Sequence, residues 1–256
     1  MLWLIITILA YFLLALVALI DKYLLGGPIP NPKVYAFLVG SFGVLALFLV
    51  PFIEFFIPSI LALVLTLIAG AIYIFALFGL YSALRVFEAS RVVPAISGIL
   101  PLFTFGLTYF LGREEIPGGF KILAFILLIL GSVLISWEKT KSVTLKSLQL
   151  SIITAFLFSL AFVFSKFVYL YLPFWPGFIW MRVGSFLIAL FFLFSKEVRE
   201  ELFKKKTTLK PKIASIFLSN QALGGGAFIL QNWAIALAPL SLLAFINALE
   251  GVKCVF

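Results

Sequence analysis

Long apolar stretches separated by short polar connections make up most of the chain. These stretches hold 17 to 26 residues each with few charges, which is the length an α-helix needs to cross a hydrocarbon core about 30 Å thick. The apolar run Ile122–Ile135 does not alternate with polar residues as a barrel strand would. We predict nine membrane-spanning helices, at Leu2–Ile20, Val34–Phe52, Ser59–Leu84, Val92–Leu111, Phe120–Ser136, Ser147–Tyr171, Gly177–Phe194, Ile213–Leu237 and Leu240–Phe256.

The second half of this series repeats the first. The matching positions share one offset of 144 residues: Lys22 with Lys166, Pro32 with Pro176, and Val39–Phe42 with Val183–Phe186. Each copy should contain five spans, an odd number, so the second copy enters the membrane in the opposite direction. Inverted repeats of this kind place a substrate site between the two halves, near the middle of the bilayer. We therefore predict an all-α membrane protein, a polytopic bundle of two inverted five-helix repeats at residues 1–140 and 147–256.

The second repeat is one span short of five. The ninth predicted span reaches Phe256, the last residue of the sequence. By analogy with the first repeat, about 30 further residues would complete this span and add a tenth. We therefore expect the sequence to be a fragment, truncated within the second repeat.

The composition supports a membrane protein and excludes several other classes. Apolar residues make up 64% of the chain, charged residues 11%, and the mean hydropathy is +1.24, values foreign to soluble domains. There is no histidine and the only cysteine is Cys254, so we predict no internal disulfide, no metal site and no cofactor.

The formal charge of +9 does not indicate nucleic-acid binding, because of where the charge lies. Its densest cluster, Lys204–Lys206 with Lys210 and Lys212, falls between two predicted spans, as expected for a cytoplasmic loop next to anionic lipid headgroups. Most of the other basic residues between spans also lie in the odd-numbered connections. Counted literally, this distribution puts those connections in the cytoplasm and the N-terminus outside.

One stretch carries features of a known transporter family. Residues 81–136 contain an aromatic-x-Ala-Leu segment beginning at Tyr81, the small pair Ala89-Ser90, Pro101 followed by Leu-Phe, and Leu111-Gly112 followed by Glu114 and Glu115. The stretch resembles the EamA-type transporters of the drug/metabolite transporter superfamily, and residues 232–251 occupy the corresponding place in the second half. One departure is Arg113, which stands between Gly112 and the glutamates.

The resemblance implies a ten-helix bundle of two five-helix repeats around a central cavity. It implies transport of small metabolites, amino acids or drugs, often outward. It also implies a cytoplasmic N-terminus, which conflicts with the orientation that the charge distribution predicts.

An acidic residue inside the ninth predicted span is the first candidate for a transport role. Glu250 lies about ten residues into that span, where a carboxylate costs at least ~2.5 kcal/mol unless it is paired or hydrated. It could couple proton movement to substrate, or form a local pair with Lys253. Asn247, three residues earlier, shares its helical face.

The eighth predicted span holds amides and a triple glycine. Gln231 and Asn232 lie deep in it and could either line a polar cavity or bind neighbouring helices together; for Asn220 and Gln221, nearer its start, we favour the second role. Gly224, Gly225 and Gly226 would allow either close helix packing or a hinge beside the substrate.

Further candidates lie in other spans. Pro94 and Pro101 could kink the fourth span for gating, with Ser97 between them. Tyr73 and Tyr81 could stack on a substrate. Lys22 and Lys166 either extend to the membrane interface or select the charge of a substrate. For Trp180 and Arg182 we favour interfacial anchoring.

Together these features predict a carrier that works by alternating access, in the cytoplasmic membrane of a prokaryote. Its partners would be a small-molecule substrate, the lipid bilayer and, where transport is coupled, protons; the oligomeric state is open. The alternatives are a non-transporting scaffold or a passive channel. An intramembrane enzyme is disfavoured, because the chain lacks histidine and clustered intramembrane carboxylates.

Overall fold

The structure, a computed structural model, describes residues 2–110, 123, 126–127, 145–204 and 210–249. Every regular element in this part of the chain is helical. Seven of its helical segments are long and apolar enough to cross a membrane, so the protein is an all-α, multi-pass integral membrane protein. The bounds are α1 (Leu2–Gly26), α2 (Pro32–Phe42), η1 (Gly43–Phe52), α3 (Ile60–Val86), α4 (Ala89–Phe110), α6 (Leu145–Tyr171), α7 (Phe174–Phe191), η2 (Phe192–Phe194), α8 (Lys196–Arg199), η3 (Glu200–Lys204), α9 (Pro211–Leu237), η4 (Leu240–Leu242) and α10 (Leu243–Ala248).

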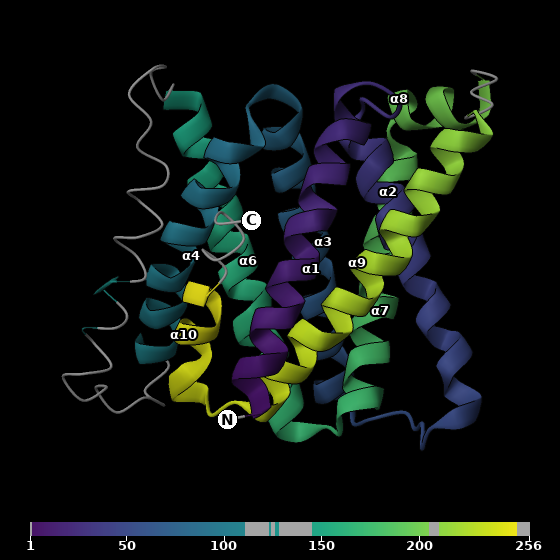
Figure 1. Cartoon of the computed structure of the whole chain (residues 1–256). Coiled ribbons are helices and arrows are strands. Elements are labelled where there is room, and N and C mark those ends of the chain that lie inside the picture. The colour runs from purple at the N-terminus through teal and green to yellow at the C-terminus, as the bar shows by residue number, and fades with distance from the viewer. Residues whose placement is uncertain (1, 111–122, 124–125, 128–144, 205–209, 250–256) are drawn as a thin grey trace.

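The long helices stand side by side in one bundle (Figure 1). The N-terminus lies at one end of the bundle and α8 at the other, so α1 runs toward the α8 end. Helix α6 starts at the α8 end and runs in the opposite direction to α1 (Figure 1). The most extensive packing joins α1 to α9, and α3 to both α6 and α7.

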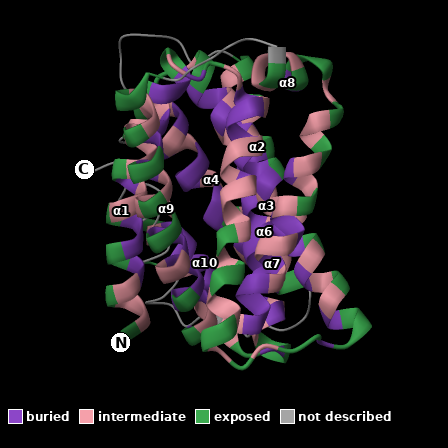
Figure 2. Ribbon diagram, turned by 90° about the vertical axis from the view of Figure 1, so that its right-hand side faces the viewer, coloured by how far each residue is buried: buried purple, intermediate pink, exposed green. Residues whose placement is uncertain are grey.

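The outer surface of the bundle is apolar. Phe48, Phe52, Ile60 and Phe110 are each at least 75% exposed, and the outward faces of the long helices are exposed or half-buried along their length (Figure 2). A soluble protein does not leave so much apolar surface in water. Lipid is the environment that these faces fit.

Two of the predicted spans differ most from the helices observed. The first was expected to end at Ile20, but α1 continues to Gly26 and so includes Asp21 and Lys22. It ends where Gly27 and Pro28 follow, residues that do not continue a helix. The second, Val34–Phe52, is divided, because α2 changes at Gly43 into the 3₁₀-helix η1, which contains Pro51.

The predicted fifth and ninth spans cannot be compared in full. Nearly all of residues 120–136 lie outside the described part of the chain, and the ninth is described only as far as Leu249. In the described part of the ninth span, η4 and α10 form the first helical turns.

Glycines bring α3 and α7 into backbone contact. A Cβ atom on Gly70 would lie 1.9 Å from the carbonyl oxygen of Met181, and one on Gly184 would lie 2.4 Å from that of Leu67. The Ser185 hydroxyl, next to Gly184, donates to the Gly70 carbonyl at 3.0 Å. Only glycine permits this approach, the usual way in which membrane helices pack closely.

Lys22 and Lys166, 144 residues apart in the sequence, make similar contacts. Lys22 Nζ donates to the carbonyls of Leu84 and Phe87 (2.7 Å to Phe87), at the C-terminal end of α3. Lys166 Nζ donates to three carbonyls at the C-terminal end of α9, those of Ile235 (2.9 Å), Ala236 (3.1 Å) and Ala238. The last carbonyls of a helix have no partner within it and carry the negative end of its dipole. Lys166 is only 4% exposed, so its ammonium group lies among these carbonyls and not in solvent.

Candidate functional site

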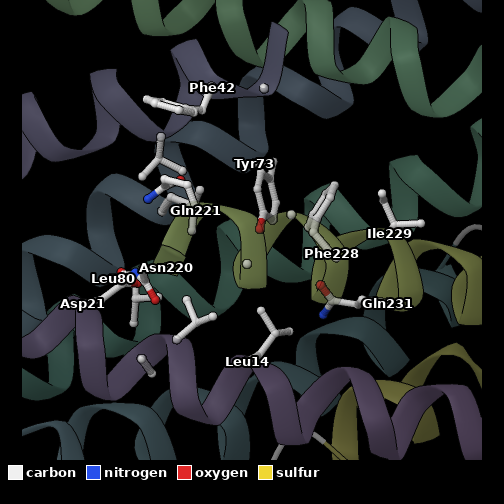
Figure 3. Close-up of a pocket in the computed structure, with 18 of the residues that line it drawn as sticks. Leu14, Asp21, Phe42, Tyr73, Leu80, Asn220, Gln221, Phe228, Ile229 and Gln231 are labelled. Atoms are coloured by element: carbon white, nitrogen blue, oxygen red, sulfur yellow. Dashed lines mark hydrogen bonds between the residues drawn. The ribbon is translucent and has the colours of Figure 1, made fainter. Parts of the chain in front are cut away.

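A cavity of about 510 Å³ lies between the helices of the two halves of the chain. Its walls come from α1, α2 with η1, α3, α4, α6, α7 and α9. The size is that of a small-molecule site, which typically combines apolar walls with a few polar groups. Figure 3 shows this arrangement, with Leu14, Leu80 and Phe228 among the apolar residues and Asp21, Asn220 and Gln231 among the polar ones.

A buried carboxylate forms the first polar group of the cavity. Asp21, on α1, is 4% exposed, and its Oδ1 accepts hydrogen bonds from the Tyr35 hydroxyl (2.5 Å) and from Asn220 Nδ2 (2.6 Å). The Tyr35 ring also packs edge-on against Tyr81 with centroids 4.7 Å apart. Both donors meet the same oxygen, so Oδ2 is the atom that a proton or ligand in the cavity could engage.

The second polar group is a cation held among aromatic rings. The guanidinium carbon of Arg182, on α7, lies 4.0 Å from the ring centroid of Phe228, 5.1 Å from that of Tyr73 and 5.8 Å from that of Phe178. Such cation–π contacts contribute about 2 kcal/mol when desolvated. Arg182 Nε is buried without a hydrogen-bond partner, and no carboxylate lies within 4.0 Å of the guanidinium among the described residues.

These two charged groups lie well apart along α9. Asn220, which contacts Asp21, and Phe228, under Arg182, are eight positions apart in one continuous helix. At 1.5 Å per residue this corresponds to ~12 Å along the helix axis. The cavity therefore has an acidic region and a basic region rather than one ion pair.

Several of the residues that the sequence singled out line this cavity. Tyr73, Tyr81, Ser97 and Gln231 do so, and the three glycines line it from α9. The helix is continuous through Gly224, Gly225 and Gly226, and a Cβ on Gly225 or Gly226 would meet no atom within 4 Å. Close packing therefore does not explain these two glycines, and the segment is not unwound in this structure.

Two of the candidate amides, Asn232 and Asn247, connect helices. Asn232 accepts a hydrogen bond from the Tyr169 hydroxyl of α6 (2.9 Å). Asn247 donates to Thr104 Oγ1 of α4 (2.8 Å), which also lies 3.0 Å from Ser159 Oγ of α6. Neither amide lines the cavity. Asn220, for which helix contacts were favoured, makes such a contact with Asp21 of α1 and also lines the cavity.

The remaining candidates lie elsewhere. Pro94 and Pro101 are buried in α4, which is helical through both positions, and neither lines the cavity. Glu250 lies outside the described residues, so its proposed coupling role stays a prediction.

Asp21 and Arg182 were missed as site residues, and both errors concern helix bounds. Asp21 was placed just beyond a span thought to end at Ile20. Arg182 was placed near a helix end, whereas it is the ninth of the 18 residues of α7. The available signal was the position of each charged side chain, at the end of a long apolar run for Asp21 and within one for Arg182. Charged residues in such positions usually face the interior of a bundle.

No protein-family model matches the chain, and no curated protein sequence matches it significantly. The functional conclusion for this chain therefore rests on its own residues.

Proposed function

We propose that the chain is a membrane carrier of small molecules that works by alternating access, with its substrate bound in the cavity lined by Asp21 and Arg182. The observation that carries this proposal is a mostly apolar cavity between the two halves that contains a buried carboxylate, Asp21, and the guanidinium of Arg182, whose Nε is buried. Ionisable residues are expensive inside a membrane and mark transport pathways when they face a cavity.

Two inverted repeats form part of the proposal. The equivalent contacts of Lys22 with the end of α3 and of Lys166 with the end of α9 support it, as do the opposite directions of α1 and α6 (Figure 1). The resemblance to EamA-type transporters, the outward direction of transport and a place in a prokaryotic cytoplasmic membrane are finer parts of the same proposal.

An asymmetry between equivalent helix pairs supports alternating access. If α6, α7 and α9 correspond to α1, α2 and α3, the pair α3–α7 corresponds to α9–α2. The first pair is in backbone contact through Gly70 and Gly184. The second meets at Phe217, whose ring contacts Tyr35 and Phe42, while the cavity separates η1 from the following turns of α9. A carrier in one state has one of two equivalent helix pairs in contact and the other apart. In its second state, the pair that was apart is in contact and the pair that was in contact is apart.

Transport is testable by filling the cavity. The purified chain is reconstituted in liposomes loaded with a defined pool of amino acids, sugars and organic acids, and their exchange is followed by mass spectrometry. A carrier saturates and is stimulated by substrate on the opposite side, a channel does neither, and a scaffold gives the leak of empty liposomes.

The variant Gly225→Leu extends a side chain into the cavity from a position with free space around its Cβ. We expect it to abolish exchange, whereas Gly26→Leu, at an exposed helix end with equally free space, should leave exchange unchanged. Equal exchange by both variants, or non-saturating flux through the unmodified chain, contradicts the proposal.

Coupling to protons would require a carboxylate in the pathway. Glu250 and Asp21 are the two candidates. Glu250→Gln and Asp21→Asn each remove a proton site while keeping the size of the side chain. We expect at least one of them to abolish proton-driven exchange and leave the exchange of substrate for substrate intact. Proton-driven exchange that survives in both variants, and in the double variant, would exclude these carboxylates as coupling sites.

A further inference from the structure

Arg182 has the properties of a binding residue rather than of a structural one. Its guanidinium faces the rings of Phe228 and Tyr73, and it carries a full positive charge without a carboxylate partner in the described part of the chain. The aromatic faces offset only part of the cost of holding that charge within a membrane protein. A planar guanidinium with free N–H groups is suited to bind a carboxylate through two parallel hydrogen bonds.

The balance of charge in the cavity limits the charge of the ligand. Among its described lining residues, Arg182 is the single cation and Asp21 the single carboxylate. A phosphate monoester brings nearly two negative charges at neutral pH, and only one positive charge would face it. A monoanion matches Arg182 one to one.

The distance between the two charged groups limits the shape of the ligand. Asp21 and Arg182 are separated by ~12 Å along α9, as the positions of Asn220 and Phe228 show. The ammonium and carboxylate of an α-amino acid are attached to one carbon atom, so such a molecule cannot contact both residues at once. An ammonium group bound near Arg182 would be desolvated without a partner there.

The surfaces next to Arg182 indicate the rest of the ligand. Tyr73, Phe158 and Phe228 line the cavity, and their rings are in mutual contact, with centroid distances of 5.9 Å from Tyr73 to Phe158 and 4.6 Å from Tyr73 to Phe228. A ring or branched chain fits this wall, because aromatic faces favour stacked or edge-on apolar partners.

From these contacts we propose that Arg182 binds the carboxylate of the substrate, and that the substrate is a monocarboxylate with an apolar, ring-sized body. The inference deepens the carrier function proposed above and rests on it. Asp21 is then a separate site, free to hold a proton while the organic anion occupies the region around Arg182.

A series of four compounds with one phenylethyl body tests the charge requirement. These are 3-phenylpropionate (anion), 3-phenylpropionamide (neutral), L-phenylalanine (zwitterion) and phenethylamine (cation). Binding to the purified full chain in detergent is measured by isothermal titration calorimetry, which avoids passive diffusion of the uncharged acid through liposomes. We expect 3-phenylpropionate to bind at least ~10-fold more tightly than each of the other three. This is the size of effect expected when a hydrogen bond to a charged group is lost.

Variants assign that preference to one residue. Arg182→Gln should abolish the preference for the anion, and Arg182→Lys should keep a part of it, because the charge remains while the paired N–H geometry is lost. Arg85→Gln is the matched control, since Arg85 is exposed at the end of α3 and outside the cavity. Each variant is first checked for a single elution peak and an unchanged Tm; if Arg182→Gln fails this check, Arg182→Lys provides the comparison.

The outcomes separate this inference from the carrier function. Equal binding of the anion and the amide, or a preference that persists in Arg182→Gln, overturns the inference. Exchange of a non-anionic compound that is unaffected by Arg182→Gln also overturns it, while the carrier function stands. Arg182-dependent binding of 3-phenylpropionate without any exchange supports the anion site and refutes the carrier function instead.

Discussion

Replacement of Lys166 by methionine tests whether a lysine really holds the end of α9. Methionine keeps most of the length and apolar volume of the side chain but removes the ammonium group. Three carbonyls, those of Ile235, Ala236 and Ala238, would lose their donor, at a site where Lys166 itself is only 4% exposed. Water therefore cannot readily replace the lost hydrogen bonds.

The expected loss of stability follows from these contacts. Hydrogen bonds that involve a charged partner contribute about 1.5–3 kcal/mol each, but the cost of burying the ammonium, which the variant avoids, offsets part of the sum. We expect Lys166→Met to lower the free energy of unfolding by about 3 kcal/mol. Lys22→Met should lower it by only about 1 kcal/mol, because Lys22 contacts two carbonyls and is half-buried.

The assay is unfolding of the purified protein in mixed micelles by increasing fractions of SDS, followed by circular dichroism. Lys196→Met serves as the control, because Lys196 is exposed in α8 and should be replaceable without effect. The reasoning is refuted if Lys166→Met is as stable as the control, or if Lys22→Met is the more damaging of the two repeat-related variants.

Three further predictions concern packing, charge and helix contacts. Gly184→Ala should destabilise the fold by about 1–3 kcal/mol, because the new Cβ would lie 2.4 Å from a backbone oxygen of α3. Gly225→Ala should instead stabilise the fold by about 0.5–1 kcal/mol, because its Cβ meets no atom within 4 Å. Unfolding of both variants in SDS checks the two signs. The hydrogen bond and charge of Lys33 lower the pKa of Glu197 below its ordinary value. The ion pair between Lys33 and Glu197 therefore stabilises the fold at neutral pH, and this stabilisation is lost as the pH falls through the lowered pKa. A ¹³C-NMR titration should show a higher pKa for Glu197 in Lys33→Met. Asn247→Leu should reduce the free energy of unfolding by about 0.6–1.7 kcal/mol, and an unchanged value would show that its bond to Thr104 is not needed.

Most of the helices could be predicted from hydrophobicity alone. The predicted eighth span, Ile213–Leu237, and the observed α9, Pro211–Leu237, end at the same residue. The cause is physical, since a membrane leaves no partner for unpaired backbone groups and so a long apolar run has to be helical. The errors lie at the ends of helices, where polar residues can still belong to a span: α1 passes Ile20 and takes in Asp21.

The cavity could be predicted only in part. The tyrosines and glycines proposed for it do line it. Nothing local distinguishes Asn220, which contacts Asp21, from Asn232, which contacts Tyr169. Both are amides on one helix, and their roles depend on which neighbouring helix each of them faces.

The sequence by itself determined that this is a helical membrane protein, because the length and hydropathy of its apolar runs are local properties of the chain. Only the tertiary structure decided what the charged residues do. The hydrogen bond between Asp21 and Asn220 joins positions 199 residues apart, and Arg182 meets rings from α3 and α9 that are distant in sequence. Such contacts depend on how the helices dock, and in a membrane docking is set by packing and hydrogen bonding between helices rather than by hydrophobicity.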